Sequence, residues 1–214
     1  VTEGLPIVLN SDALESVDVD GDGRVDLVVG SNTADWRKLV YFNREDGWEE
    51  QFSHGVLSNT YHFDVETRTR EDGTVEVYSA FMQYRMINKE NQARTGLIRY
   101  EWTEDGLVAP NDAVYFDDDR ANPYVRVGIG DLNGDGVIDL VAGRKLGGLE
   151  AWTGKGDGTY LLEQSPELAG PGRAFHIELV DMNGDGRDDI VAGFATVEEK
   201  QGGVRLWLTG ERDE

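Results

Sequence analysis

Three short stretches of the chain carry oxygen-bearing side chains at a fixed spacing. They begin at Asp18, Asp131 and Asp181, and each reads Asp-x-Asp/Asn-Gly-Asp-Gly-x-x-Asp followed at once by an apolar run. Carboxylates or amides stand at positions 1, 3, 5 and 9, and glycines at positions 4 and 6. Calcium binds about six to eight oxygen ligands, and acidic side chains at alternate loop positions can converge on one ion. Because glycine allows the tight turn that this requires, the spacing predicts three calcium loops.

Two other interpretations of these loops were weighed. An EF-hand needs a bidentate Glu at position 12 and flanking helices. Position 12 is instead Val29, Ala142 or Ala192, inside apolar runs that favour strand, so the EF-hand is excluded. A turn rich in Asp and Gly that binds no ion is the second interpretation, and three copies with the same spacing argue against it.

Composition limits the function classes. The chain has 214 residues, a formal net charge of −22, 27 glycines and no cysteine. Such an acidic chain does not suit nucleic acid, whose phosphates attract Lys and Arg. Without cysteine there is neither a disulfide nor thiol chemistry, and no apolar run approaches the ~18 residues of a membrane span.

A repeat of 50 residues organises the chain. The position-5 acids Asp135 and Asp185 lie 50 residues apart, and Asp72 lies 50 residues after Asp22. This spacing predicts a fourth, degenerate loop in which four inserted residues separate the second acid from the third. Its acids would be Asp64, Glu66, Asp72 and Glu76. Because it lacks the glycine at position 4 and carries Glu at positions 3 and 9, we expect it to hold no ion.

Each repeat also contains strand signals. One apolar run enters each loop, a second leaves it, and a third is followed by an Asp-Gly turn in three of the four repeats, which is a strong hairpin signal. Four-stranded antiparallel units repeated at this period are typical of β-propeller blades. The sequence therefore predicts an all-β fold, a single β-propeller domain over residues 1–214. Its four blades would span about 11–54, 60–117, 122–166 and 172–210.

The last blade has room for only three strands before the chain ends, and an unassigned apolar stretch, Leu5 to Leu9, precedes the first blade. Pro6 suits an outermost strand, which tolerates a missing N–H. We expect residues 5–9 to complete the last blade and close a ring of four. The alternative is a fragment of a propeller with seven or eight blades.

The pattern Asp-x-Asp/Asn-Gly-Asp-Gly-x-x-Asp-Leu/Ile-Val-x-Gly resembles the FG-GAP (VCBS-type) repeat of integrin α-subunit propellers, fungal propeller lectins and secreted bacterial and archaeal proteins. The resemblance implies calcium as the bound ion, with ligands from loop positions 1, 3, 5 and 9 and the position-7 carbonyl. The first two sets would be Asp18, Asp20, Asp22, Arg24 (carbonyl) and Asp26, and Asp131, Asn133, Asp135, Val137 (carbonyl) and Asp139. The third would be Asp181, Asn183, Asp185, Arg187 (carbonyl) and Asp189.

The resemblance implies a secreted or cell-surface module whose calcium ions stabilise the fold. We expect no catalytic residue, because the three histidines (His54, His62 and His176) lie outside any nucleophile motif; His62 and His176 are expected to be packed or hydrogen-bonded in the core. The partner would be a protein, a glycan or another copy of the chain, in adhesion or scaffolding. The alternative function is the propeller part of a secreted carbohydrate-active enzyme, of lyase or dehydratase type.

A long hairpin in the second repeat, Phe81 to Arg94, exceeds its counterparts by roughly ten residues and carries aromatic, Met and Arg side chains. Such residues are favoured at binding hot spots. They would equally suit a longer strand pair whose apolar face packs on its neighbour, and both interpretations stay open.

Overall fold

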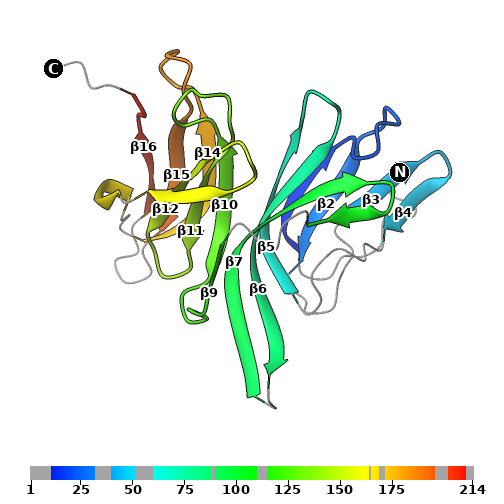
Figure 1. The fold of residues 1–214 in the computed structure, drawn as a ribbon, viewed down its shortest axis with the longest axis horizontal. Coiled ribbons are helices and arrows are strands. Elements are labelled where there is room, and N and C mark those ends of the chain that lie inside the picture. The colour runs from blue at the N-terminus through cyan, green and yellow to red at the C-terminus, as the bar shows by residue number, and fades with distance from the viewer. Residues whose placement is uncertain are drawn as a thin grey trace. The chain divides into compact units, whose positions relative to one another are not determined.

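The computed structural model describes residues 11–31, 40–51, 60–87, 90–109, 115–163, 165–168, 172–195 and 202–210. The chain divides into two compact units, Val1–Pro123 (unit 1) and Tyr124–Glu214 (unit 2), and Figure 1 labels most of their strands. In the part of the chain that is described, no helix has the length and apolar character needed to cross a membrane.

Unit 1 contains two antiparallel sheets. Sheet 1 has the order β1-β2-β3-β4, and sheet 2 has the order β5-β6-β7-β8 with β9 paired to β7. The strands of sheet 1 are β1 (Ser11–Val17), β2 (Asp26–Ser31), β3 (Val40–Arg44) and β4 (Gly47–Gln51). Those of sheet 2 are β5 (Thr60–Thr69), β6 (Val75–Ile87), β7 (Glu90–Thr103), β8 (Gly106–Val108) and β9 (Tyr115–Asp117).

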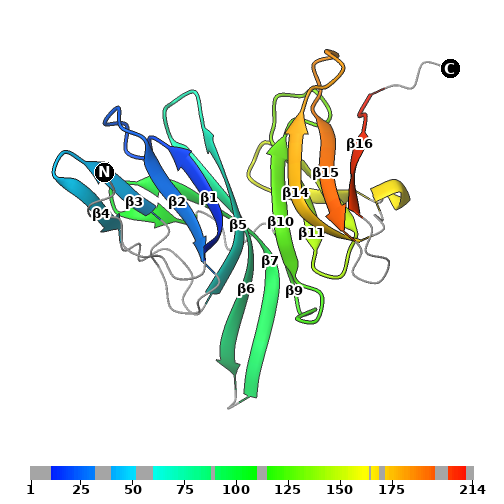
Figure 2. The same ribbon diagram turned by 180° about the vertical axis from the view of Figure 1, so that it is seen from behind.

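Unit 2 contains the other two sheets, which are seen most clearly in Figure 2. Sheet 3 has the order β10-β11-β12-β13, and sheet 4 has the order β14-β15-β16. The strands of sheet 3 are β10 (Tyr124–Gly130), β11 (Asp139–Arg144), β12 (Leu149–Gly154) and β13 (Tyr160–Glu163). Those of sheet 4 are β14 (Arg173–Val180), β15 (Asp189–Ala195) and β16 (Gly202–Trp207), and one 3₁₀ turn, η1 (Pro166–Leu168), precedes β14.

These sheets confirm the predicted fold class, an all-β chain built from four antiparallel, propeller-like units. The Asp-Gly turns connect the third and fourth strands of sheets 1, 2 and 3, and their glycines Gly47, Gly106 and Gly158 have φ of 135°, 101° and 86°. Glycine adopts this left-handed backbone without steric cost. The stretch Leu5 to Leu9 lies outside the described residues, so closure of one ring, and with it the single-domain assignment, stays a prediction.

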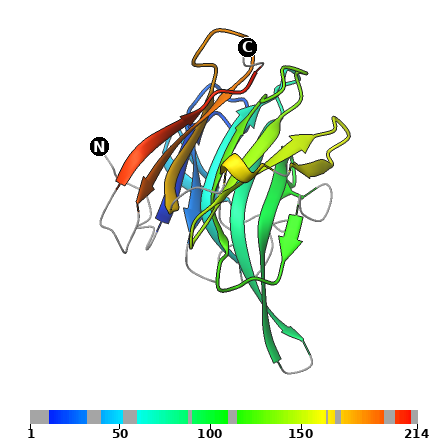
Figure 3. The same cartoon turned by 90° about the vertical axis from the view of Figure 1, so that its left-hand side faces the viewer.

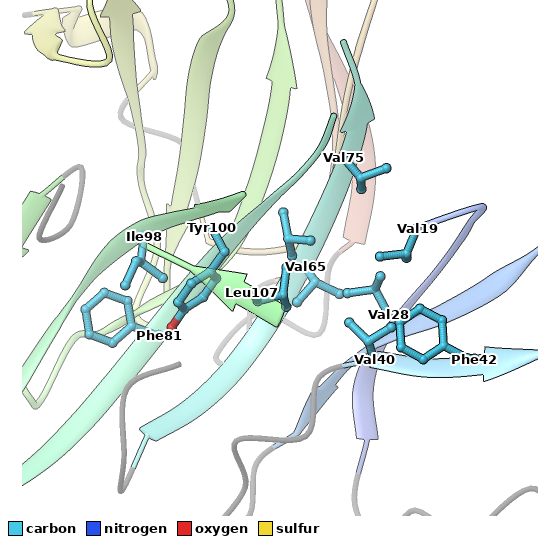
Figure 4. Packing of buried hydrophobic residues seen from close by; sticks show 11 residues of the cluster. Val19, Val28, Val40, Phe42, Val65, Val75, Phe81, Ile98, Tyr100 and Leu107 are labelled. Atoms are coloured by element: carbon cyan, nitrogen blue, oxygen red, sulfur yellow. The ribbon is translucent and has the colours of Figure 1, made fainter. Parts of the chain in front are cut away.

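The sheets of each unit pack through apolar faces. In unit 1 the core joins Val28, Val40 and Phe42 of sheet 1 to Val77 and Tyr100 of sheet 2, all at most 1% exposed; Figure 4 shows most of this cluster. In unit 2 the buried cluster of sheets 3 and 4 includes Val141, Ile177, Ile190, Ala192 and Phe194. Burial of one such aliphatic or aromatic side chain contributes about 1.5–3 kcal/mol.

The strand register places the three loops. Val17 pairs with Asp26, Gly130 with Asp139, and Val180 with Asp189 at the ends of the first ladders of sheets 1, 3 and 4. Position 9 of each loop is therefore the first residue of the second strand. The residues of positions 1 to 8 form the connection between two rigid strands, which holds both ends of the loop in place.

Candidate metal centres

The backbone of the three loops bends at the two predicted glycines. We call residues 18–26 loop 1, residues 131–139 loop 2 and residues 181–189 loop 3. The glycines at positions 4 and 6 all have positive φ, between 75° and 86°. They are Gly21, Gly23, Gly134, Gly136, Gly184 and Gly186. A residue with a Cβ is strained in this conformation, which explains why the sequence places glycine at both positions.

The aspartate at position 1 organises each loop from its centre. In loop 2, Asp131 Oδ1 accepts the N–H of Gly134 at 2.7 Å and Oδ2 accepts that of Gly136 at 2.7 Å. Asp18 and Asp181 accept the equivalent pairs of N–H groups at 2.6 to 2.9 Å. These main-chain bonds lower the pKa of the Asp181 carboxyl, so the ionised form, which ligates metals, is favoured.

Positions 3 and 5 each use one oxygen to hold the loop. In loop 2, Asn133 Oδ1 accepts the N–H of Asp135 at 2.9 Å, and Asp135 Oδ1 accepts that of Val137 at 2.8 Å. The same two bonds recur in loops 1 and 3. In loop 1, carboxylate oxygens of Asp18, Asp20 and Asp22 lie within 4.8 Å of one another. Three carboxylates this close repel one another, which a divalent cation would offset.

Position 9 has a second role that the sequence did not indicate. Asp26, Asp139 and Asp189 are at most 1% exposed. Asp139 Oδ2 accepts the N–H of Leu132 at 2.9 Å, and its Oδ1 accepts the N–H of Gly154 at 2.8 Å. Gly154 is the last residue of β12. The other two carboxylates accept the same pair of main-chain N–H groups. Asp26 accepts those of Val19 and Asn43, and Asp189 accepts those of Met182 and Thr209. This carboxylate therefore ties its loop to the third strand of the sheet.

Burial raises the pKa of the Asp26 and Asp139 carboxyls, although their main-chain hydrogen bonds act in the opposite direction. Each carboxylate oxygen accepts one N–H and keeps a second lone pair. A metal ligand at position 9 is therefore compatible with the bonds that the structure gives these residues, and the donor set as a whole fits a hard divalent cation.

A comparison with known families matches the part of the chain that contains loops 2 and 3. Residues 131–192, from loop 2 through most of β15, match the model of the FG-GAP-like repeat. Residues 131–192 therefore carry an FG-GAP-type repeat. No curated protein matches the sequence of the chain. The matched segment contains loops 2 and 3. The hydrogen bonds of their residues at positions 1, 3 and 5 recur in loop 1, which therefore has the same local geometry.

Two of the FG-GAP loops are joined to each other. The N–H of Asp188 in loop 3 donates to the carbonyl of Asp131 in loop 2 at 2.7 Å, and the N–H of Asp131 donates to Asp188 Oδ2 at 2.8 Å. Asp188 stands at position 8, which is Val25 in loop 1 and Ile138 in loop 2. Asp131, the position-1 residue of loop 2, is thereby held by the neighbouring loop.

The second repeat has a hairpin in place of the predicted degenerate loop. Asp64 and Glu66 lie inside β5, where they pair with Ala80 and Tyr78, and a tight turn closes with the N–H of Arg70 on the carbonyl of Thr74 at 2.9 Å. The four inserted residues lengthen the strand instead of the loop. Asp64, Glu66, Asp72 and Glu76 therefore do not share one loop.

Arginine side chains neutralise the acids of this hairpin. The Glu76 side chain is only 4% exposed; its Oε1 lies 3.3 Å from Arg99 Nη1 and 3.7 Å from Arg70 Nη1. Its Oε2 accepts the Tyr78 hydroxyl at 3.0 Å. Arg70 also binds Asp72 at 2.7 Å and Glu101 at 3.3 Å. Two guanidinium groups thus lie beside the acids of the second repeat, where the other repeats carry the predicted calcium loops.

Replacing Glu76 with Gln is expected to lower the free energy of unfolding by about 3 kcal/mol, because it leaves two guanidinium groups beside a neutral, buried partner. Urea denaturation in calcium and in chelator would measure the loss, which should be equal in both. Glu71→Gln, on the exposed turn, is the matched control and should cost little. A loss seen only in calcium would mean that this repeat binds an ion after all.

The two described histidines differ. His62 is 1% exposed, and its Nδ1 lies 2.9 Å from Ser79 Oγ, which confirms the prediction of a hydrogen-bonded core residue. His176 is wrongly predicted: its side chain is 71% exposed, on β14, with Nε2 3.3 Å from Glu178. A bulge between Ala174 and His176 shifts the register of β14, and Phe175 and His176 are both exposed there. His54 lies outside the described residues.

Stability is expected to fall as the pH drops below 6.5, because burial lowers the pKa of His62 to about 3. Between these two values the unfolded chain binds a proton at this histidine and the folded chain does not, so acid favours unfolding. From pH 7.5 to 5.5 the loss should be about 1.4 kcal/mol. It should disappear in His62→Phe and persist in His176→Gln when urea midpoints are compared. An unchanged slope in His62→Phe would contradict the assignment.

The long hairpin is present as β6 and β7, whose pairing continues as far as Ile87 opposite Glu90. It extends past the other strands of sheet 2 (Figure 3). Phe81 is fully buried in the core of unit 1, whereas Tyr84 is half-buried with its ring 5.5 Å from that of Tyr61. Packing therefore accounts for Phe81, and a binding role for the hairpin stays a prediction.

Proposed function

We propose that this protein is a calcium-stabilised, non-catalytic binding or scaffolding module of the extracellular space or cell surface. The observation that carries the proposal is the repetition of one loop geometry three times on a scaffold of FG-GAP-type, propeller-like sheets. In loop 1 the carboxylate oxygens of positions 1, 3 and 5 lie within 4.8 Å of one another. In all three loops the position-1 carboxylate is held by main-chain N–H groups.

The proposed location follows from the affinity expected of such loops. Calcium sites of extracellular modules have dissociation constants of about 10⁻⁴–10⁻³ M, so millimolar calcium fills them. The acidic charge of −22 supports cation binding, because three divalent ions would offset part of it, and the rest disfavours nucleic acid as a partner.

The described histidines support a non-catalytic role. His62 and Ser79 form a Ser–His pair, but each is 1% exposed, so no substrate reaches either atom without unfolding of the strand pair. Ser79 Oγ also donates to the main-chain carbonyl of Asp64 at 2.7 Å. A nucleophile needs a free position beside it for the reacting carbon, and the pair is therefore assigned to the core.

The partner is proposed to be a glycan or a protein, including a second copy of the chain. Binding to a glycan array and to immobilised extracellular proteins, in calcium and in chelator, would test this. Calcium-dependent binding without cleavage of any bound polysaccharide is the expected result. New unsaturated ends in an assay on the same polysaccharides would instead favour a lyase, and binding that is equal in chelator would contradict a calcium-ordered module.

A further inference from the structure

One position beside each loop differs in charge. A residue outside each loop donates its main-chain N–H to the position-9 aspartate; this donor is Asn43 for loop 1, Gly154 for loop 2 and Thr209 for loop 3. The position in question comes directly after the donor. We call the next residue the flanking position; it is Arg44, Lys155 or Gly210. Because the same hydrogen bond fixes the preceding residue in all three sheets, the flanking position has the same relation to each loop.

In loop 1 the flanking side chain is bound to the loop itself. Arg44 Nη1 lies 2.5 Å from Asp20 Oδ2 and 3.3 Å from Asp22 Oδ2. Its Nε lies 2.9 Å from Glu49, and its guanidinium carbon lies 4.2 Å from the centre of the Phe42 ring. These contacts fix the guanidinium over the oxygens of positions 3 and 5 that the loop backbone does not use.

Loops 2 and 3 lack a paired cation of this kind among the described residues, although Arg187 of loop 3 lies beside Gly134 of loop 2. In loop 3 a Cβ on Gly210 would come within 2.7 Å of Asp185 Oδ2, so the flanking position adjoins the position-5 carboxylate but supplies no charge. In loop 2 the flanking residue is the exposed Lys155. Its main-chain N–H donates to the carbonyl of Thr159 at 3.0 Å. Among the described residues, no ion pair reaches the acidic side chains of either loop.

Building on the proposed calcium role, we infer that Arg44 is a built-in counter-cation of loop 1, so that calcium orders the loops of unit 2 selectively. A cation that already binds Asp20 and Asp22 occupies two of the oxygens a calcium ion needs and repels the ion itself. At about 4 Å two unit charges interact by nearly twice RT even in water, and the calcium charge doubles this. Unit 1 then carries its own cations throughout, Arg44 at loop 1 and Arg70 and Arg99 at the hairpin of sheet 2.

The order of calcium affinities that this predicts is opposite to the order expected from the number of carboxylates. At positions 1, 3, 5 and 9, loop 1 has four aspartates, whereas loops 2 and 3 have three aspartates and one asparagine each. Charge count alone makes loop 1 the tightest calcium site. With the guanidinium in place, loop 1 is instead the weakest site and the loop whose order depends least on calcium.

Hydrogen exchange on the whole chain, in calcium and in chelator, tests this loop by loop. Peptides covering 131–139 and 181–189 should exchange about tenfold faster in chelator, and the peptide covering 18–26 less than about twofold faster. Arg44→Gln should make loop 1 respond about tenfold as well. Lys155→Gln is the matched control and should change nothing, whereas Arg44→Lys keeps the charge and should preserve most of the insensitivity.

The outcomes separate the inference from the function on which it rests. Equal responses of all three loops in the unsubstituted chain, or an unchanged loop 1 in Arg44→Gln, would overturn the role of Arg44 and leave calcium binding intact. No response in any loop would overturn both. Hydrogen exchange is measured for each peptide separately. A variant that only lowers the global stability would raise exchange in the core strands as well as in the loop, and this distinguishes it from a local effect.

Discussion

Removal of calcium with a chelator is expected to lower the melting temperature by about 5–15 °C. At roughly 2 mM calcium, binding to the folded state alone contributes about 0.6–2 kcal/mol per site for the affinities of extracellular modules. Two or three filled loops then supply a sizeable share of a typical stability of ~5–15 kcal/mol. In a chain of this size 1 kcal/mol corresponds to about 2–4 °C.

Calorimetric melts in calcium and in chelator, both at low salt, measure the difference. A variant with Asp22, Asp135 and Asp185 all replaced by Asn is the control, because position 5 is exposed in every loop and takes no part in the core. Its melt should be the same in both buffers. A melt of the unsubstituted chain that chelator leaves unchanged would contradict stabilisation by calcium.

Replacement of Asp139 with Ala is expected to cost about 3–5 kcal/mol even in chelator. The carboxylate is 1% exposed and accepts two main-chain N–H groups, those of Leu132 and Gly154. Without it both donors lose their partner in the interior, at about 1–3 kcal/mol each and more when the acceptor was charged. Asp135→Ala, in the same loop but exposed, is expected to cost less than about 1 kcal/mol in chelator.

Urea denaturation of the two variants distinguishes the two roles that one motif combines. Asp135→Ala should lose stability only when calcium is present, whereas Asp139→Ala should lose it in both buffers. If Asp139→Ala were harmless in chelator, position 9 would be a metal ligand alone. If both variants behaved alike, the distinction between the exposed ligands and the buried carboxylate would be wrong.

The local features of the loops could be read from the sequence because each is set by a few adjacent residues. Glycine at positions 4 and 6 is required by a positive φ, and an Asp-Gly pair between apolar runs is a hairpin. The periodicity of these signals gave the strands, as at β10 to β13, and the family model agrees with the motif at residues 131–192.

Features that depend on strand register could not be read in this way. Arg44 meets Asp20 only because β3 pairs with β2 so that Asn43 reaches Asp26. The buried role of position 9 has the same origin. In the second repeat the spacing of 50 residues suggested a stretched loop, whereas Asp64 and Glu66 extend β5 and Glu76 binds arginines from the turn and from β7. The sequence does contain the arginines concerned, Arg44 at the end of the third strand of sheet 1 and Arg70 and Arg99 in the second repeat. Their partners depend on the strand register.

A calcium titration by calorimetry on the whole chain, with the ions counted per molecule, tests the central claim most directly. The account predicts saturable binding with two stronger sites and one weaker site, and loss of one stronger site in each of Asp135→Asn and Asp185→Asn. The absence of saturable binding in the millimolar range, or a stoichiometry that neither substitution changes, would contradict the assignment of these loops as calcium sites.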